Sequence, residues 1–238
     1  MYDLSEHKCI SFEVTDDCNM KNVHHKCPIH HQQYDTSYGK LNEEKICLSI
    51  EEANRLNFKG YIEFHHYNEP LLNKEMILNI MQRNKKNRFI LITNGLLLSR
   101  NISENEFLKQ FSLVTISCYY PNLHPFFEQL KKTYGNIIIS TSPLDDRLAF
   151  YDYPERTDIA ICPRVFFELP IDHYGNVRLC CFDWQNKYKI GNINKSSLRE
   201  VVESDLYQNI LHESKNKMIS DKWIPCRHCE YGISVGNQ

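Results

Sequence analysis

Four cysteines in the last third of the chain have the residue type and the spacing that hold a metal centre. Seventeen residues lie between Cys162 and Cys180, 45 lie between Cys180 and Cys226, and Cys226 forms a Cys-x-x-Cys pair with Cys229. The polar N-terminal segment lacks the apolar run of a secretion signal, so we expect a reducing compartment, where such thiols bind metals rather than form disulfides. The set predicts an iron–sulfur cluster or a tetrahedral zinc ion.

A second group of metal-binding side chains follows the first apolar stretch of the chain. Cys18-Asn19 comes after two aspartates, and Cys27-Pro28-Ile29-His30 follows shortly after. This segment resembles the cluster loop of the radical S-adenosylmethionine (radical SAM) superfamily. In that family three cysteines spaced Cys-x3-Cys-x2-Cys hold a 4Fe-4S cluster and leave one iron open for S-adenosylmethionine (AdoMet).

The loop departs from the family pattern, and three ligand sets remain open. Five extra residues precede Cys27, and His30 stands where the third cysteine is expected. We favour Cys18, Cys27 and His30; a second assignment has His24 in place of His30, and a third has Cys9. Imidazole ligands raise the potential of an iron–sulfur cluster, as in Rieske centres, whereas reduction of AdoMet needs a low one. If a histidine is a ligand, its surroundings must therefore lower the reduction potential of the cluster.

Two short segments resemble AdoMet-binding segments of the same family. Asn68-Glu69-Pro70 resembles the Gly-Gly-Glu-Pro segment, which implies that Asn68 and Glu69 bind AdoMet, with the carboxylate on its amino group. Thr93-Asn94-Gly95 resembles a Thr-Asn-Gly turn, which implies that Thr93 and Asn94 shape the floor near AdoMet. Ser117 and either Ser140 or Thr141 are expected to face the ribose, since sites in parallel βα folds lie at the carboxyl ends of strands.

The last third of the chain resembles the SPASM/twitch family of auxiliary-cluster modules. The resemblance rests on Cys162, the turn from Asp172 to Asn176, the segment from Val177 to Trp184, and the closing pair Cys226 and Cys229. It implies the shorter twitch form, with one auxiliary 4Fe-4S cluster on Cys162, Cys180, Cys226 and Cys229. Cys181 is an alternative to Cys180, because adjacent side chains of a strand point to opposite faces. The spacing is similar to that of the 2-deoxy-scyllo-inosamine dehydrogenases.

A repeating βα pattern must position these residues. Runs rich in β-branched and aromatic residues predict strands at 9–14, 60–64, 89–93, 113–118 and 137–141, and amphipathic segments predict helices at 49–57, 73–84, 103–110 and 124–134. Strands that alternate with helices indicate a parallel sheet. We predict an α/β fold with a partial (β/α)6 TIM-like barrel.

A smaller module is predicted to follow this barrel. Strands at 165–169 and 177–181 flank a turn and form a hairpin, and a helix covers about 197–215. We expect residues 1–145 to form the core, with an extension to 160 as an alternative, and residues 146–238 to form the connection and the twitch module.

Composition narrows the class of partner. The 238 residues carry 28 basic and 30 acidic side chains, so no basic footprint for nucleic acid is expected. No stretch approaches the about 20 apolar residues of a membrane span. We expect a cytoplasmic protein that binds a small-molecule substrate and an electron donor such as flavodoxin or ferredoxin.

The resemblance implies an enzyme, a radical SAM oxidoreductase that cleaves AdoMet and oxidises a hydroxyl-bearing small molecule, either a sugar or an aminocyclitol. The auxiliary cluster would accept an electron from the substrate. Two alternatives within enzymes are a peptide- or protein-modifying enzyme and an epimerase with Cys118 as hydrogen donor. An alternative of another class is a non-catalytic metal-binding protein with a degenerate cluster loop.

Overall fold

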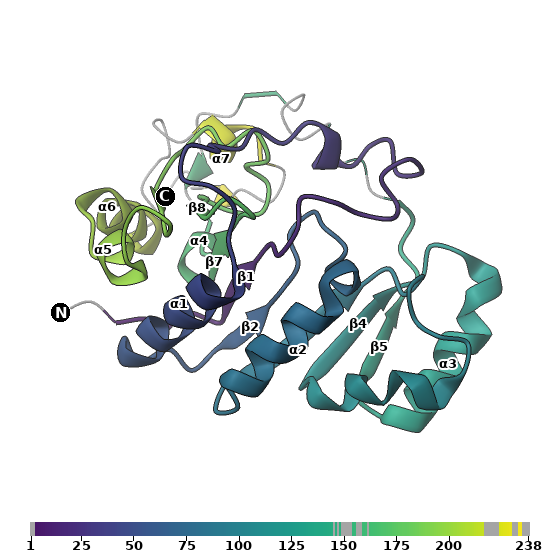
Figure 1. Ribbon diagram of the computed structural model, residues 1–238. Coiled ribbons are helices and arrows are strands. Elements are labelled where there is room, and N and C mark those ends of the chain that lie inside the picture. Colours follow the sequence, from purple (N-terminus) through teal and green to yellow (C-terminus); the bar gives the residue numbers. More distant parts are fainter. Residues whose placement is uncertain are drawn as a thin grey trace.

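One eight-stranded sheet forms the centre of the structure, which is a computed structural model (Figure 1). The structure describes residues 3–144, 146, 148, 154–155, 159–160, 162–216, 224–229 and 233–234. In spatial order the strands are β5 (Ile137–Ser140), β4 (Leu113–Ser117), β3 (Arg88–Thr93), β2 (Tyr61–Glu63), β1 (Cys9–Phe12), β7 (Glu168–Ile171), β8 (Asn176–Val177) and β9 (Gly191–Asn192). Neighbours from β5 to β7 pair in parallel, whereas β8 and β9 continue the sheet antiparallel.

This sheet confirms the predicted α/β fold with a partial barrel. All five strands predicted in the first part of the chain are present, and β7 adds a sixth parallel strand beside β1. The order runs from β5 to β9 without joining its ends, so the sheet is open. The carboxyl ends of the parallel strands therefore share one edge, the upper edge in Figure 1.

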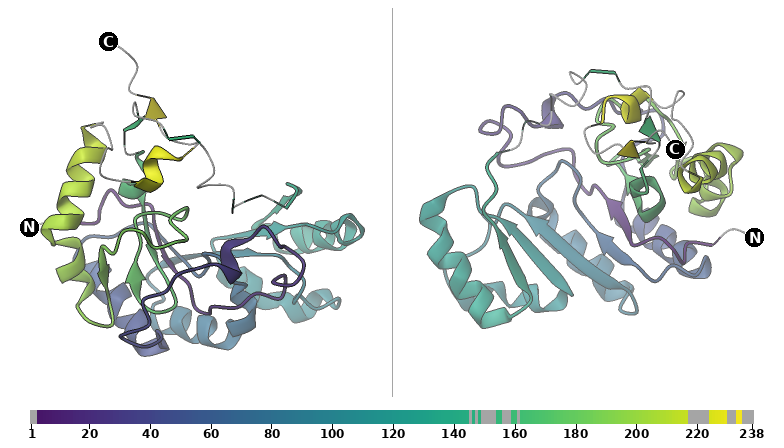
Figure 2. Two further views of the ribbon diagram at one scale, coloured as in Figure 1. Left: turned by 90° about the horizontal axis from the view of Figure 1, so that it is seen from above. Right: turned by 180° about the vertical axis from the view of Figure 1, so that it is seen from behind.

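Three helices pack against the parallel strands: α1 (Glu43–Arg55), α2 (Lys74–Arg83) and α3 (His124–Tyr134). Figures 1 and 2 show α1 and α2 on one face of the sheet, with the loop after β1 passing over its upper edge. Ile46 and Ile80, from α1 and α2, are fully buried. Burial of each such side chain stabilises the fold by about 1.5–3 kcal/mol.

The strand residues alternate between these two faces. In β1, Ile10 and Phe12 are fully buried in the helix-covered core, while Cys9 and Ser11 between them are half-buried. In β2 the half-buried Glu63 follows the buried Ile62. Because side chains of a strand alternate with a period of two, the polar residues share the face without helices.

Two helical predictions need correction. Helix α1 begins at Glu43, earlier than predicted, because the side chain of Asn42 accepts a hydrogen bond from the Lys45 amide and caps the helix. The predicted helix at 103–110 is a 3-10 helix, η3 (Ile102–Gln110), with a kink at Asn105. The Asn105 side chain donates to backbone carbonyls of the preceding turn, which competes with regular α-helical bonding.

The C-terminal module contains the predicted hairpin, because β7 pairs antiparallel with β8, but the bounds of its strands and helix differ from the prediction. The segment predicted as a strand at 165–169 begins with a short helix, α4 (Arg164–Phe167), and the strand that follows, β7, pairs with β1. The predicted long helix is two helices, α5 (Leu198–Val202) and α6 (Asp205–Lys215), because the Ser204 side chain accepts from the Tyr207 amide and starts a new helix. The module also contains α7 (Ile224–Arg227) and a small antiparallel pair of β6 (Ile159–Ala160) with β10 (Ile233–Ser234).

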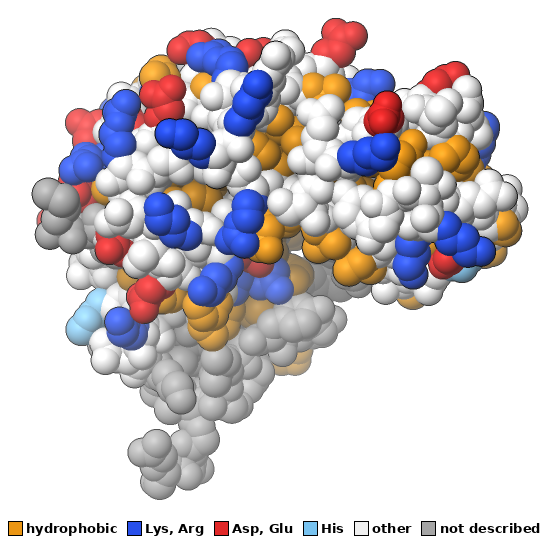
Figure 3. Space-filling view, turned by 90° about the horizontal axis from the view of Figure 1, so that it is seen from below, with side chains coloured by type: hydrophobic (Ala, Val, Ile, Leu, Met, Phe, Trp, Pro, Cys, Tyr) orange, Lys and Arg blue, Asp and Glu red, His pale blue; other side chains and the backbone are white. Residues whose placement is uncertain are grey.

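The outer surface carries charges of both signs. Viewed from below, Lys and Arg side chains are interspersed with acidic and apolar ones (Figure 3). Among the described residues, no helix is both long and apolar enough for a membrane span.

Gly95, in the turn after β3, offers a test of the packing between the sheet and α3. Its φ is +73°, and an added Cβ would lie 2.7 Å from Phe127 and 2.8 Å from Ile116. Gly95→Ala should destabilise the protein by about 1–3 kcal/mol, measured from urea unfolding. Gly39→Ala is the matched control, because Gly39 has a φ of +76° but no atom within 4 Å of the added Cβ. Equal losses in both variants would contradict the packing argument.

Candidate functional site

A pocket at the carboxyl edge of the sheet, which we call the front pocket, gathers residues from four connecting segments. The loop after β1 supplies Cys18, Met20, His24 and Cys27; the segment after β2 supplies His65, Tyr67, Asn68 and Glu69; and β3 and β4 with their following turns supply Ile92, Thr93, Asn94, Ser117 and Tyr119. The pocket therefore unites seven of the site residues predicted from the sequence, on four separate segments, together with the alternative ligand His24: Cys18, Cys27, Asn68, Glu69, Thr93, Asn94 and Ser117. Parallel strands bring these segments together because their carboxyl ends meet at one edge.

The two cysteines of the loop after β1 lie near each other in this pocket. Cys18 is half-buried, Cys27 is buried, and the Met20 amide donates to the Cys18 thiol at 3.4 Å. Burial raises the pKa of the Cys18 thiol to about 11, with smaller contributions from the nearby Glu69 and Cys27. A bound cation or cluster would reverse this effect, because a metal favours the thiolate.

The two candidate histidine ligands lie in different surroundings. His24 is buried and lines the front pocket with Cys18 and Cys27. His30 is exposed, at the end of the 3-10 helix η1 (Pro28–His30), and its Nε2 lies 2.8 Å from the carbonyl oxygen of Lys21. His30 is not among the residues that line the front pocket. Ligation by His30 stays a prediction, and the structure brings His24 rather than His30 beside the two thiols.

Glu69 is held in the front pocket by backbone and side-chain donors. Its Oε1 accepts from the Leu71 amide at 3.0 Å and from the Thr93 hydroxyl at 2.7 Å, and its Oε2 accepts from the Asn94 amide at 2.9 Å. The side chain of Asn94 donates in turn to Asn19 at 2.6 Å. Burial raises the pKa of Glu69, and these donors oppose that effect. The carboxylate is thus pre-oriented between the cysteine loop and the turn after β3.

The other residues that we predicted to bind AdoMet differ in whether they line the front pocket. Asn68 lines the front pocket, but its side chain bonds to the His66 amide and the Phe64 carbonyl and so shapes the loop. Ser117 lines the same pocket. Ser140 pairs with Ser117 in the sheet and its hydroxyl donates to Ser142, while Thr141 lies in a separate cavity lined by Cys118. The structure therefore brings Ser117, but neither Ser140 nor Thr141, into the front pocket.

Four thiols of the C-terminal module form a second group, here called the rear cage: Cys162, Cys180, Cys226 and Cys229. Burial raises the pKa of Cys226, and the neighbouring Cys162, Cys229 and Asp183 raise it further. Cys180 is buried, and Cys226 is one of the negative neighbours that raise its pKa. The other three predicted thiols are thus neighbours of Cys226 in space.

Within the described part of the chain, no three Cys, His, Asp or Glu side chains converge on one point. The donor set of the rear cage is four thiols, which is the ligand chemistry of a tetrahedral zinc site and also of an iron–sulfur cluster. Their shared position and all-thiol chemistry fit such a cluster.

Cys180 and Cys181 point to different sites. Cys180 accepts a hydrogen bond from the Phe182 amide within the rear cage, whereas Arg164 donates to the Cys181 thiol at 2.9 Å. Cys181 lines a cavity of about 300 Å³ against the helix-free face of the sheet, which we call the central cavity. The two adjacent residues, which follow β8 rather than lie in a strand, thus face the rear cage and the central cavity, and this favours Cys180 as the ligand.

The central cavity contains acidic residues that we did not predict from the sequence. Glu63 from β2 and Glu168 from β7 line it together with Arg164 and Cys181. In the sequence, both glutamates stand next to apolar strand residues. This alternation predicts that they lie on the polar face of a sheet, but it does not predict a binding site. Only the parallel pairing of β1 with β7 brings Glu168 close to Glu63.

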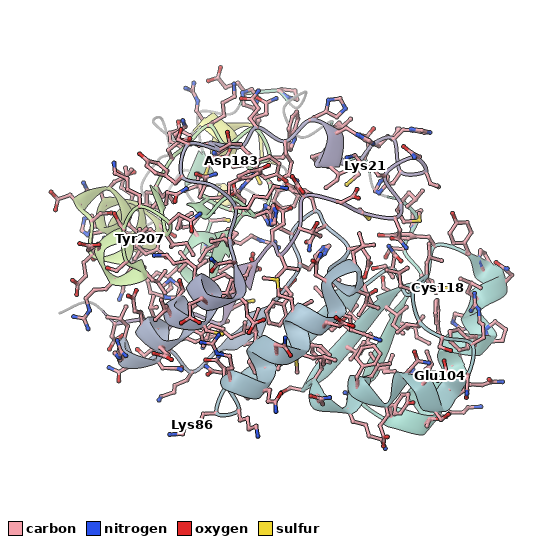
Figure 4. The ribbon with its side chains drawn as sticks, viewed as in Figure 1. Lys21, Lys86, Glu104, Cys118, Asp183 and Tyr207 are labelled. Carbon is pink, nitrogen blue, oxygen red and sulfur yellow. The ribbon has the colours of Figure 1, made fainter. Side chains whose placement is uncertain are left out.

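A buried polar network joins the residue that follows β1, Glu13, to the C-terminal module, because the His173 amide donates to the Glu13 carboxylate at 3.3 Å. Arg178 and Asp172 are both fully buried, and Arg178 donates to Asp172 through Nε at 3.3 Å and Nη2 at 3.1 Å. Arg178 also donates to the Asp183 carbonyl at 3.1 Å. Figure 4 shows Asp183 of the module and Lys21 of the cysteine loop on the same side of the sheet.

Comparisons with known proteins agree with this arrangement. Residues 162–230 match the SPASM family, an iron–sulfur cluster-binding domain. The crystal structure of BtrN in complex with AdoMet and 2-DOIA superimposes with a TM-score of 0.73 and 20% sequence identity, over 97% of this chain and 94% of BtrN. The chain has the radical SAM fold with a C-terminal SPASM module. The predicted resemblance to this fold is therefore confirmed.

Two further structures share the radical SAM fold. BtrN in an open conformation has a TM-score of 0.66 at 19% identity, over 94% of this chain and 92% of BtrN. The enzyme anSMEcpe with bound AdoMet has a TM-score of 0.55 at 15% identity, over 95% of this chain and 85% of anSMEcpe. A search of curated protein sequences finds no match. Within the shared fold the front pocket of this chain lies at the strand ends, and the cysteines of the rear cage lie in the region that matches the SPASM family.

Proposed function

We propose that the protein is a radical SAM oxidoreductase that oxidises a hydroxyl-bearing small molecule, a sugar or an aminocyclitol. One observation supports this most directly: the central cavity shares His65, Tyr67 and Ile92 with the front pocket, and Cys181 joins the same cavity to the rear cage. A substrate in the central cavity would lie between the two groups of thiols. That arrangement suits a reaction in which the substrate loses a hydrogen atom toward the front pocket and an electron toward the rear cage.

The front pocket would hold a 4Fe-4S cluster on Cys18, Cys27 and a histidine, with AdoMet beside Glu69, and the rear cage would hold a second cluster. Bound together, a reduced cluster and AdoMet would supply abstraction of a hydrogen atom from a substrate carbon, and the second cluster would supply an acceptor for the remaining electron. Loss of the hydroxyl proton of the substrate to solvent would complete the oxidation to a carbonyl. Flavodoxin or ferredoxin would supply the electron that starts each turnover.

The protein's own residues have roles in this proposal that follow from their contacts. Thr93, Asn94 and the Leu71 amide hold Glu69 so that its carboxylate is ready for the amino group of AdoMet. Tyr67 donates a hydrogen bond to the backbone carbonyl of Cys181, which ties the wall of the front pocket to the SPASM module.

Modification of a peptide is the second candidate function. Its support is the likeness to anSMEcpe. The structure of anSMEcpe with bound AdoMet and the Cp18Cys peptide superimposes on this chain with a TM-score of 0.53 at 15% identity. The volume of the central cavity, about 300 Å³, favours a small molecule over an extended peptide.

Anaerobic reconstitution with iron and sulfide tests the proposed function. We expect about eight iron atoms per chain, as two 4Fe-4S clusters require, and release of 5′-deoxyadenosine from AdoMet with dithionite. Oxidation should consume one AdoMet per carbonyl formed. Binding of zinc alone, or no cleavage of AdoMet with a strong reductant, would favour the non-catalytic alternative and sink the proposal.

The choice of histidine is tested by a pair of variants. His24→Ala should lose the cluster of the front pocket, with a fall to about four iron atoms per chain. His30→Ala should keep about eight, because His30 is exposed and lies outside the pocket. Iron content and the electron paramagnetic resonance signal of the reduced protein provide the measurement. The opposite pattern would restore the assignment of His30.

A further inference from the structure

Glu13 carries a fully buried carboxylate directly after β1. It is the one charged side chain in the apolar run 9–14. Its amide donates to the Ile171 carbonyl at 2.9 Å, which continues the pairing of β1 with β7. Because burial of an ionised carboxyl group is costly unless it accepts hydrogen bonds, a charge at this position needs several donors.

Four donors from three segments surround this carboxylate. Its Oε1 accepts from the Gln32 side chain and from the Tyr67 amide, each at 3.2 Å. Its Oε2 accepts from the Tyr34 hydroxyl at 3.1 Å and from the His173 amide at 3.3 Å. The donors belong to the loop after β1, the segment after β2, and the turn between β7 and β8. Two carboxylate oxygens provide about four acceptor sites, so these donors fill them.

Arg178 is the cation of this buried network. Its Cζ lies 5.3 Å from the centre of the Tyr34 ring, and its charge attracts the carboxylates of both Asp172 and Glu13. Burial raises the pKa of Glu13 to about 7, and Arg178 opposes this effect. At pH 8 the Glu13 carboxylate is thus ionised and accepts from all four donors.

Tyr67 connects this carboxylate to the front pocket. The Tyr67 side chain lines the pocket, and Glu69 follows two residues later. The Glu69 amide donates to the Asp17 carbonyl at 3.1 Å. The segment is therefore held through its main chain at two points, by Glu13 at Tyr67 and by Asp17 at Glu69. These contacts set the direction in which the Glu69 carboxylate enters the pocket.

We propose that Glu13 is a positioning residue for AdoMet, because its carboxylate holds the segment from Tyr67 to Glu69 against the loop after β1 and the SPASM module. This inference rests on the proposed function, in which Glu69 binds the amino group of AdoMet. Glu13 is not among the described residues that line the front pocket. It acts through the backbone of the segment and does not touch AdoMet.

Glu13→Gln tests the positioning role. The variant keeps the shape of the side chain but replaces one oxygen by a donor, which cannot accept from the two groups that face it. Binding of AdoMet to the anaerobically reconstituted, unreduced protein is measured by calorimetry at pH 8. We expect a loss of affinity of about tenfold, as one hydrogen bond to a charged group provides. With dithionite, the KM for AdoMet should rise in proportion, while kcat changes by less than about threefold.

Local hydrogen exchange separates positioning from loss of fold. The amides of residues 65–69 should exchange at least about tenfold faster in Glu13→Gln, whereas those of β3 and α2 should stay protected. Glu52→Gln is the matched control. Glu52 accepts from the Leu198 amide at 2.6 Å, so it also joins the core to the C-terminal module, but it does not line the front pocket. Its replacement should change neither AdoMet affinity nor exchange at residues 65–69.

A second variant keeps the test decisive if Glu13→Gln does not fold. Glu13→Asp retains the charge beside Arg178 but is shorter by one methylene group, so it cannot hold the amides of Tyr67 and His173 together. It should weaken AdoMet binding in the same direction. Unchanged AdoMet affinity in a folded Glu13 variant overturns the inference, and so does faster exchange over the whole sheet alike.

The exchange and binding measurements need no turnover. If Glu13→Gln loosens residues 65–69 and weakens AdoMet binding, but the wild type oxidises no hydroxyl compound, the inference stands and the proposed function fails. If the wild type oxidises its substrate and Glu13→Gln binds AdoMet as tightly, the proposed function stands and the inference fails.

Discussion

Cys226→Ser is expected to remove the cluster of the rear cage and to lower the iron content from about eight to about four atoms per chain. Cys226 has the other members of the cage as neighbours, since Cys162 and Cys229 affect its thiol and Cys226 affects that of Cys180. Because the free energy of metal binding also stabilises the fold around the ligands, loss of one ligand should open the SPASM module. Iron and sulfide assays with circular dichroism of the reconstituted variant measure both effects.

Cys181→Ser is the matched control for this variant. Cys181 follows Cys180 directly but lies in the central cavity beside Arg164, so its replacement should leave about eight iron atoms per chain. Cys226→Ser, by contrast, should lower the rate of substrate oxidation but keep cleavage of AdoMet, because its front pocket is intact. If Cys181→Ser loses iron and Cys180→Ser does not, the assignment of the two neighbours is reversed.

Arg178→Ala should cost about 3–5 kcal/mol of folding free energy, because it leaves a buried carboxylate without its cation. Arg178 and Asp172 are both fully buried, and the buried Glu13 carboxylate is a further negative neighbour of Arg178. Arg178 also holds the Asp183 carbonyl, which follows the cage residue Cys180 by only a few positions. The variant should therefore lose iron from the rear cage as well as stability.

Arg199→Ala provides the comparison for Arg178. Arg199 is 41% exposed and pairs with Glu203 at 3.7 Å one helical turn away, so its loss should change the free energy of unfolding by about 0.5 kcal/mol or less. Unfolding by urea under anaerobic conditions, with the iron content measured beside it, separates the two variants. Similar losses in both would mean that the buried network contributes little.

Prediction from the sequence succeeded where local patterns suffice. The five parallel strands of the core are short apolar runs, and α3 covers the predicted residues 124–134. Local capping explains the corrections: Asn42 starts α1 early, and Ser204 divides the last predicted helix. Such caps depend on a few hydrogen bonds between a side chain and the backbone, and these compete with the hydrogen bonds of a continuous helix.

The sequence by itself determined the class of this protein, because cysteine spacing and strand–helix alternation are written locally along the chain. Tertiary structure alone decided the neighbours within the site. It buries His24 beside Cys18 and Cys27, leaves His30 exposed, and brings Glu63 and Glu168 to one cavity through the pairing of β1 with both β2 and β7. Contacts between residues more than 100 positions apart depend on the order of strands in the sheet, and no local periodicity encodes that order.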